Sequence, residues 1–284
     1  MRELKYTAHD GTVIDLDTDS LWVADLQEMR GFAWTYTLAS RGIRSVSRNA
    51  STAKMTVRTK TPAVLDAAQT AFDADVQAVK PGMLTVDGEW SQHAYIVGSS
   101  LGLVPWPDYA QVDYTAVLCD GVWHRALPVQ HFFPMAAGTS SQLDLPTDLP
   151  TDLASSRIAL TVDNPTGKTA EFSAIIFGPC TNPSFRLGGN TYEVDVTVPY
   201  GGYVSLSATG LSKTITLTDE NGDVTNIFDK GVRGDGAGSG SYVFEPIPAG
   251  KSLLEISSNY GIDLTLYDVS GGVPWRTLSS QTAS

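Results

Sequence analysis

Cysteine is nearly absent from the sequence, which has only Cys119 and Cys180 among its 284 residues. Two cysteines far apart along the chain supply neither a disulfide framework nor the clustered ligands of a zinc site. Each follows an apolar stretch, so we expect both to be buried free thiols.

Long hydrophobic runs are also missing. No apolar run reaches the roughly 18 residues of a membrane span, so we expect no membrane insertion. The segment Met1–Thr7 lacks the apolar core of a secretory signal. We therefore expect no signal peptide and synthesis in a cytoplasm.

Positive charge is scarce, with 19 Lys and Arg against 31 Asp and Glu, a net charge of −12 and a pI near 4.6. Nucleic-acid binding needs a basic face, so this composition argues against it. An acidic surface does suit a conduit that DNA traverses without sticking, although many unrelated proteins are acidic. A hydrophobic content of 42% excludes a disordered chain, and the length fits two domains.

One segment of the first half has a helical pattern. Thr61 can cap a helix, Pro62 fits its first position, and Pro81-Gly82 ends it. Between them lies one apolar stripe, made of Val64, Leu65, Ala68, Phe72, Val76 and Val79. We expect a helix over about residues 62–79.

The other segments before residue 132 alternate as strands do. Residues 32–38 predict a half-buried strand. The pattern of residues 21–29 is ambiguous, with a short helix as one interpretation, and the arginine-containing residues 41–50 fit a loop or arm. The remaining expected strands cover residues 5–7, 13–16, 54–60, 83–86, 90–97 and 112–119. Residues 1–131 thus predict an α+β domain with one helix on a sheet.

The rest of the chain predicts an all-β domain over residues 132–271, followed by a flexible tail over 272–284. Its clearest feature is a buried strand, Phe172–Phe177, closed by a double corner at Gly178-Pro179 and Asn182-Pro183. Regularly spaced short strands without a helix predict a β-sandwich or jelly roll. These expected strands cover residues 158–162, 172–177, 184–187, 192–198, 203–206, 214–218, 242–244, 253–256 and 263–267.

One motif was tested for nucleophilic catalysis. Gly98-Ser99-Ser100-Leu101-Gly102 matches G-x-S-x-G, but the nucleophile elbow needs a helix directly after the serine. The prolines that follow disfavour that helix, so a plain loop is the better interpretation of this segment. The bases and acids considered for Ser100 are His124, His131, Asp108 and Asp113.

Other patterns indicate no definite site. The segment with Asp219, Asn221 and Asp223 does not have glycine and glutamate where an EF-hand needs them. The remaining interpretations are a turn or a surface calcium site. We interpret Arg233-Gly234-Asp235 as part of a glycine-rich loop rather than as an adhesion motif. The four histidines share no metal-ligand spacing. The aromatic residues considered for stacking on sugars, although aromatics in a sandwich are more often core, are Trp106, Tyr200, Tyr203 and Trp275.

The order of these turns resembles one family. A single helix closed by Pro-Gly and a Trp-bearing hairpin precedes an all-β part that carries four turn motifs. These are Asp163-Asn164-Pro165-Thr166-Gly167, Phe177-Gly178-Pro179-Cys180-Thr181-Asn182-Pro183, Asn221-Gly222, and Pro248-Ala249-Gly250 before a Leu-Leu-Glu-Ile strand. In this order the chain, to about Trp275, resembles the distal tail protein (Dit) family of long-tailed phages, the siphophages.

The resemblance implies a structural virion protein at the phage tail tip, or baseplate, and not an enzyme. It implies a hexameric ring built by the N-terminal domain and a galectin-like C-terminal sandwich. Implied partners are the tail-tube protein, the tail-tip or tail-associated lysin protein and receptor-binding proteins, with DNA only passing through the lumen. It implies no catalytic, cofactor-binding or metal-binding residues and no cofactor. The alternative function is a carbohydrate-binding or host-adhesion module that uses the sandwich.

Overall fold

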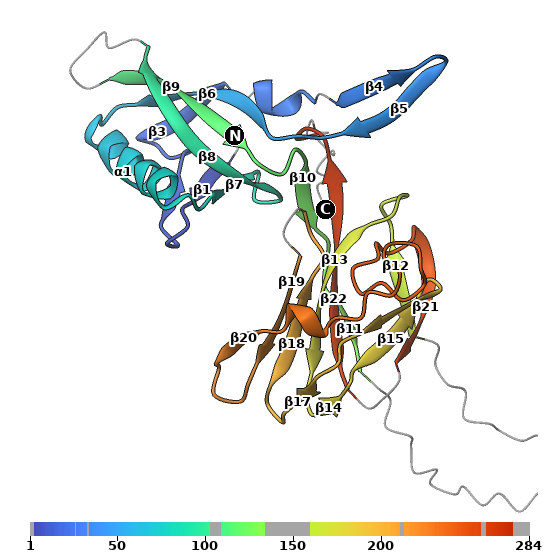
Figure 1. Ribbon diagram of the computed structural model, residues 1–284. Coiled ribbons are helices and arrows are strands. Elements are labelled where there is room, and N and C mark those ends of the chain that lie inside the picture. The colour runs from blue at the N-terminus through green and yellow to red at the C-terminus, as the bar shows by residue number, and fades with distance from the viewer. Residues whose placement is uncertain are drawn as a thin grey trace, which may run out of the picture. The chain divides into compact units, whose positions relative to one another are not determined.

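The computed structural model describes residues 3–25, 27–32, 34–102, 109–133, 160–210, 213–256 and 260–274. It is mainly antiparallel β-structure, as the sequence predicts, with one α-helix in the described ranges (Figure 1). The chain divides into two compact units: unit 1 comprises Met1–Ala126 and Val269–Ser284, and unit 2 comprises Leu127–Asp268. The division falls a few residues before the expected boundary at residue 131, and the end of the chain returns to unit 1.

Unit 1 is an antiparallel sheet in which the long strand β8 pairs with three neighbours. The order across it is β3 (Leu21–Asp25), β6 (Ser51–Thr59), β9 (Ala110–Leu118), β8 (Trp90–Leu101), β7 (Gly82–Val86), β1 (Leu4–Thr7) and β2 (Val13–Asp15), with β10 (Trp123–Ala126) also paired to β8. The expected hairpins β1–β2 and β7–β8 are both present. Strict alternation of buried and half-buried residues along β9 explains why this segment forms a strand with one apolar face.

Helix α1 (Ala63–Ala78) covers the apolar face of this sheet through Phe72. The Phe72 ring meets Tyr6 of β1 edge-on at 5.1 Å between centroids and Tyr114 of β9 at 5.4 Å. Two details of the sequence prediction are wrong. The helix begins without a side-chain cap from Thr61, and Val79 lies beyond its last turn in the left-handed conformation, so it is exposed rather than part of the stripe.

A buried carboxylate ties α1 to the strand beneath it. Asp75 is fully buried and accepts a hydrogen bond from the Tyr6 hydroxyl at 2.5 Å. The backbone N–H of His9 donates to its other oxygen at 3.1 Å, and the His9 ring nitrogen Nδ1 lies 2.5 Å from that oxygen. Burial, and then the bond to Asp75, raise the pKa of Tyr6. These contacts fix α1 over the β1–β2 hairpin.

Three segments near residues 20–50 differ from the sequence prediction. Residues 21–29 form β3 and a 3-10 turn at Gln27–Arg30 instead of a helix, because Leu21 and Val23 pair with Thr59 and Val57 of β6. Residues expected as a half-buried strand form β4 (Thr35–Ala39), which is exposed on both faces. The expected loop or arm is strand β5 (Gly42–Ser47), paired with β4 in a separate ribbon.

The end of the chain contributes to unit 1. Val273, placed by the sequence in a flexible tail, is buried in the unit 1 core, and its N–H donates to the Met29 carbonyl at 3.2 Å. The expected tail from residue 275 onward lies outside the described residues. Residues 272–274, the first of the tail expected over 272–284, are described, and among them Val273 is part of the packed core.

Unit 2 is a sandwich of two antiparallel sheets. One has the order β11 (Gln130–Phe132), β22 (Ile262–Ser270), β13 (Glu171–Phe177), β18 (Tyr203–Ser207), β19 (Thr214–Thr218) and β20 (Val224–Asn226). The other has the order β12 (Leu160–Asn164), β21 (Gly250–Ile256), β15 (Ser184–Leu187) and β16 (Asn190–Glu193). Phe172 of the first sheet meets Tyr192 of the second at 5.3 Å, and Tyr192 stacks on Phe185 at 4.8 Å. The expected all-β sandwich is confirmed.

The double corner after β13 also matches the sequence. Strand β13 ends at Phe177, the Gly178-Pro179 bond is cis, and Asn182 has a positive φ of 47°. Between the corners, β14 (Cys180–Thr181) forms a small ladder with β17 (Thr197–Val198).

The expected strand over residues 242–244 is wrong: these residues lie in a turn region where the Val243 N–H donates to the Val232 carbonyl. The short tandem repeat Leu-Pro-Thr-Asp over residues 145–152, which the sequence places in a surface loop, lies outside the described residues.

Asn164 joins two of the turn motifs in unit 2. Its side-chain Nδ2 donates to the carbonyls of Lys168, Ile247 and Pro248 at 2.9–3.0 Å. Its Oδ1 accepts from the hydroxyl of Thr166 at 2.7 Å. One amide, which is only 1% exposed, therefore satisfies the backbone of both the Asp163–Gly167 turn and the turn at Pro248.

We predict that Asp75→Ala lowers the free energy of unfolding of unit 1 by about 2–4 kcal/mol, because it leaves the Tyr6 hydroxyl and the His9 N–H without their buried acceptor. All six tryptophans fall in the residue ranges of unit 1, so urea unfolding followed by tryptophan fluorescence reports on this unit. Asp73→Ala, on an exposed face of the same helix, is the control. Equal effects of the two substitutions would contradict the role of Asp75.

We predict that Asn164→Asp destabilises unit 2 by about 2–4 kcal/mol, because a carboxylate cannot donate to the three carbonyls that Nδ2 serves. Calorimetry measures the loss, and hydrogen exchange locates it in β12 and β21. Asn221→Ala, in the exposed β19–β20 turn, should change stability by less than about 0.5 kcal/mol. Unchanged exchange in β12 and β21 of Asn164→Asp would refute the prediction.

Candidate assembly surface

The most exposed apolar feature of unit 1 is the β4–β5 ribbon, here called the arm and defined as residues 34–48. It extends outward from the sheet of unit 1 (Figure 1). Its two strands pair only with each other among the described strands. Every residue of both strands is exposed.

The arm has one apolar and one hydroxyl face. The cross-strand pairs Tyr36–Val46 and Leu38–Ile43 lie on one face. The exposed fractions are 57% for Tyr36, 53% for Val46, 71% for Leu38 and 61% for Ile43. On the other face the Thr37 and Ser45 hydroxyls are 2.5 Å apart. An isolated two-stranded ribbon is marginally stable in water, so an uncovered apolar face on it makes the arm a candidate for a surface that another molecule covers.

The base of the arm is anchored to unit 1. The Arg48 guanidinium lies over the Trp34 ring at 3.9 Å from its centroid. Its nitrogens also pack against Gly271, where an added Cβ would come within 2.6 Å of one of them. Burial lowers the pKa of Arg48, which nonetheless stays a cation. Both residues of this cation–π contact belong to the arm, so the contact orders the base of the arm, whereas the packing against Gly271 connects that base to the chain outside the arm.

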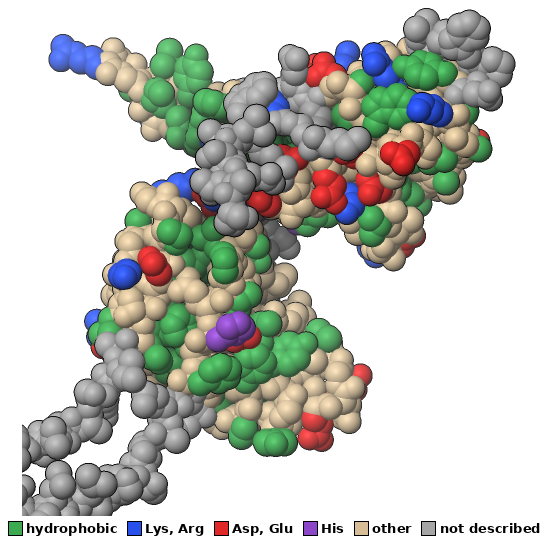
Figure 2. Space-filling model, turned by 180° about the vertical axis from the view of Figure 1, so that it is seen from behind, with side chains coloured by type: hydrophobic (Ala, Val, Ile, Leu, Met, Phe, Trp, Pro, Cys, Tyr) green, Lys and Arg blue, Asp and Glu red, His purple; other side chains and the backbone are tan. Residues whose placement is uncertain are grey.

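The arm is the basic part of an acidic chain. It carries Arg41, Arg44 and Arg48 and no acidic residue, whereas the whole chain has a net charge of −12. Figure 2 shows hydrophobic side chains along this projection and positively charged side chains at its tip. The arm is therefore complementary in charge to the rest of the same protein.

A concentration of carboxylates lies elsewhere on unit 1, around the β1–β2 hairpin. Burial raises the pKa of Asp17, and the neighbouring carboxylates of Asp15, Glu3 and Asp87 raise it further. Glu3 is also paired with Lys5. Like charges gathered in this way disfavour each other, so this region would gain from a cationic partner.

The residues considered for nucleophilic catalysis are not assembled as a triad. Ser100 lies within β8, opposite Asp113 of β9, so residues 98–101 are part of a strand and not the expected plain loop. Residues 103–108, where the helix of a nucleophile elbow would lie, are outside the described residues. Asp113 accepts a hydrogen bond from Thr56, and His131 is bound to Asp263 at 2.7 Å. His124 is buried in β10. Asp108 lies outside the described residues.

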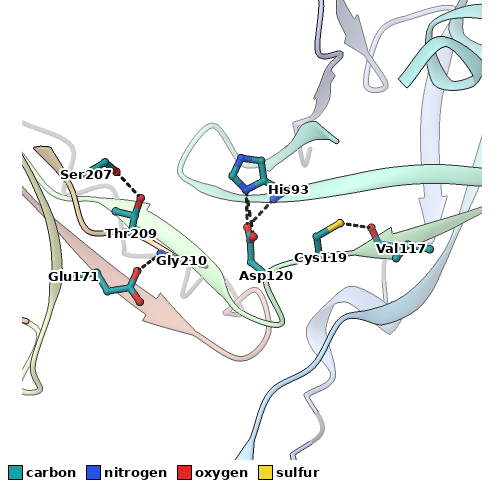
Figure 3. A network of polar contacts seen from close by, with 8 residues as sticks. All are labelled: His93, Val117, Cys119, Asp120, Glu171, Ser207, Thr209 and Gly210. Carbon is teal, nitrogen blue, oxygen red and sulfur yellow. Dashed lines mark hydrogen bonds and ion pairs between the residues drawn. The ribbon is translucent and has the colours of Figure 1, made fainter. Parts of the chain in front are cut away.

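The histidines form separate polar contacts rather than a cluster. His93 of β8 meets Asp120 at 3.1 Å, and its backbone N–H donates to the same carboxylate at 2.8 Å (Figure 3). The hydrogen bond to Asp120 raises the pKa of His93. Burial favours a higher pKa for Asp120, but the bonds from His93 outweigh it and leave the pKa lowered. No group of three metal-ligating side chains occurs in the part of the chain described.

The remaining sequence motifs are structural turns. The Asp219 side chain accepts from the backbone N–H groups of Asn221 and Asp223, which lowers its pKa. Arg233 of the Arg-Gly-Asp tripeptide lies over the Phe228 ring at 4.2 Å and donates to the Phe228 carbonyl. Its guanidinium is thus engaged within unit 2, which disfavours an adhesion role.

The aromatic residues considered for sugar binding are not gathered in one described place. Tyr200 is 81% exposed at the β17–β18 turn, while Tyr203 pairs with Phe177 within the sheet. Trp106 and Trp275 lie outside the described residues.

Figure 3 also shows polar contacts of unit 2, including the Glu171 carboxylate accepting from the Gly210 N–H at 2.8 Å. No helix in the described ranges is long and apolar enough to cross a membrane.

Sequence reasoning missed the arm as an assembly surface, although its signal was present. Tyr36 and Leu38 alternate with threonines on one side of the Ser40-Arg41 turn, and Ile43 and Val46 continue the pattern on the other.

Both cysteines are free thiols, as expected, but Cys119 and Cys180 are only half-buried. Burial raises the pKa of both.

Comparisons with known proteins identify the fold. No protein-family model matches the chain, and no curated protein matches it. The chain is similar to a chain of the phage P2 baseplate in its activated conformation with Ca, with a TM-score of 0.63 and 13% identity over 96% of this chain and 100% of that one. The P2 baseplate with Sr gives the same values. The Dit protein of phage SPP1, a paradigm of the hub adsorption apparatus in phages that infect Gram-positive bacteria, is matched with a TM-score of 0.49 and 12% identity over 94% of this chain and 99% of that one. The chain therefore has the fold of a phage baseplate protein.

We predict that unit 1 loses stability as the pH rises from 6 to 8, in part through His93. A raised folded-state pKa means that the His93 contribution is complete below about 6.5 and is lost as the pH passes through the raised pKa. Since His93 is 45% exposed, we expect less than about 1 kcal/mol. Fluorescence-detected urea midpoints of wild type and His93→Gln at both pH values measure it.

The comparison between the two proteins isolates His93 from the other histidines of unit 1. His93→Gln should show a smaller fall in midpoint than the wild type. Asp120 affects stability only at acid pH. Because its pKa is lowered in the folded protein, its contribution to the free energy of unfolding is lost as the pH falls below about 3.8. Identical falls between pH 6 and 8 would contradict the prediction.

Proposed function

We propose that this chain is a distal tail protein of a long-tailed phage, a structural hub that forms a hexameric ring at the end of the tail tube. Two independent lines support this. The order of turn motifs resembles that family, and the fold is shared with a baseplate chain over nearly the full length of both. The observation that carries ring formation is the arm, an apolar, basic ribbon with both faces in water.

The occupant that best fits the arm is a second copy of the same chain. Burying Tyr36, Leu38, Ile43 and Val46 removes apolar surface from water, at roughly 1.5–3 kcal/mol for each fully covered side chain. The arginines of the arm would meet a chain that is otherwise strongly acidic. When the arm of each copy binds the next copy, the contact is head-to-tail, and such contacts close into a ring when the rotation allows.

The acidic character of the chain suits the lumen of such a ring. Six copies would carry a net charge of about −72, and carboxylates along the lumen would repel DNA phosphates during passage. In this role the protein contacts the tail-tube protein on one side and the tail-tip or lysin protein on the other, with receptor-binding proteins attached, in the virion. It performs no catalysis and needs no cofactor.

We predict that the purified protein scatters light as a particle near 180 kDa, six copies of 30.3 kDa, and that Leu38→Ser with Ile43→Ser reduces it to a monomer. The double substitution removes apolar contact area but keeps the backbone pairing of the arm. Thr37→Ala with Ser45→Ala, on the opposite face of the same strands, is the matched control and should retain the ring. Tryptophan fluorescence checks that all variants are folded.

Salt gives a second test of the same contact. Since the arm is basic and the chain acidic, raising the ionic strength from about 0.05 M to 0.5 M should shift the equilibrium toward smaller species. A wild-type protein that is monomeric at every concentration would refute self-assembly through the arm. A ring that persists in Leu38→Ser with Ile43→Ser would assign the ring contact to another surface.

A further inference from the structure

An open groove of about 360 Å³ lies on the smaller sheet of unit 2. It is lined by Arg186, Gly188, Gly189, Ser252, Leu253 and Glu255. These residues come from β15, from the β15–β16 turn and from β21, which lie side by side in the sheet (Figure 1). The volume falls within the range of small-molecule sites.

The groove forms where a strand ladder opens. Strands β15 and β21 pair as far as Leu187 and Leu254. Beyond that pair, β15 turns into β16 through Gly188 and Gly189, both with positive φ, while β21 continues beside β12. An added Cβ at Gly188 would lie 2.8 Å from the Pro248 ring, so glycine is required at this turn. At Gly189 an added Cβ would meet nothing within 4 Å, so this wall of the groove is bare backbone.

Two opposite charges lie side by side in the wall of the groove without an ion pair between them. Arg186 and Glu255 are direct cross-strand partners, and both are exposed. Within the described residues, neither their guanidinium nor their carboxylate has a hydrogen-bond or ion-pair partner. A strong donor and a strong acceptor therefore stand on neighbouring strands, with Cβ atoms about 5 Å apart.

This pairing selects the chemistry of a ligand. Glu255 would repel an anion and Arg186 would repel a cation, so a ligand with a single net charge gains from only one of them. A small zwitterion would pair with both charges but offers no extended C–H face, whereas a neutral molecule with adjacent hydroxyl groups donates to the carboxylate, accepts from the guanidinium and can also pack against an apolar side chain. Leu253, 51% exposed in the groove, offers an apolar contact for the C–H face of such a molecule.

We propose that this groove is a binding site for a neutral saccharide. Arg186 donates to one ring hydroxyl, Glu255 accepts from the neighbouring hydroxyl, and Leu253 packs against the sugar ring. Ser252 and the backbone of the Gly188-Gly189 turn line the same groove. The site goes beyond the hub role, because it does not depend on ring formation.

The test uses the full chain and titration calorimetry with a panel of neutral sugars: glucose, galactose, mannose, rhamnose, N-acetylglucosamine and their disaccharides. Glycerol 1-phosphate and choline serve as the anionic and cationic comparators. We expect at least one neutral sugar to bind with a Kd below about 10 mM and to bind more tightly than either charged probe. Arg186→Gln and Glu255→Gln should each weaken that binding at least about tenfold.

Lys251→Gln is the matched control, because Lys251 is an exposed cation on β21 outside the groove. It should change the Kd by less than about twofold. Calorimetric unfolding of all three variants confirms that unit 2 is intact. The proposal is overturned if no neutral sugar binds, if a charged probe binds more tightly, or if binding survives both Arg186→Gln and Glu255→Gln.

Discussion

Each sheet of this chain has an apolar face that must be kept from water, and the chain covers these faces in different ways. In unit 1 the cover is a single helix, whose Phe72 ring is held edge-on between Tyr6 and Tyr114. In unit 2 two sheets cover each other, with Tyr192 packed against Phe172 and Phe185. The arm has no cover among the described residues. A ribbon of this kind gains too little from its own hydrogen bonds to justify an apolar face, so its sequence makes sense as one side of an interface.

The helix that covers unit 1 is fixed by a polar contact rather than by packing alone. Burying Asp75 is costly unless its oxygens are satisfied, and Tyr6 and His9 satisfy them from the β1–β2 hairpin. Such a contact is specific in a way that apolar packing is not, because a helix shifted by one turn would leave a buried carboxylate unpaired. The base of the arm is ordered in a similar way, since Arg48 lies over Trp34 and packs against Gly271.

The sequence predicted elements whose pattern and ends are both local. Three such features could be predicted because each depends on neighbours along the chain. They are the alternation of residues 112–119, the strand end at Gly178-Pro179 and the helix end before Pro81. The pattern of residues 21–29 was ambiguous in the sequence because their strand exists only through pairing with β6. The arm was misjudged for a different reason: alternation shows that a strand has two unlike faces, but not whether anything covers the apolar one. The groove could not be predicted, since it depends on Arg186 and Glu255 meeting from strands far apart in sequence.

The fold is shared with a chain that is only 13% identical, so most side chains of the two proteins differ. Core positions tolerate many apolar residues, whereas a turn that must satisfy particular backbone groups tolerates few side chains. Asn164 shows the difference, because only an amide can donate to the carbonyls of Lys168, Ile247 and Pro248 while accepting from Thr166. A resemblance built on the order of such turns therefore reports on architecture. The arm and the groove are made from exposed residues outside these turns, and so their partners follow from their own charge and shape rather than from the fold.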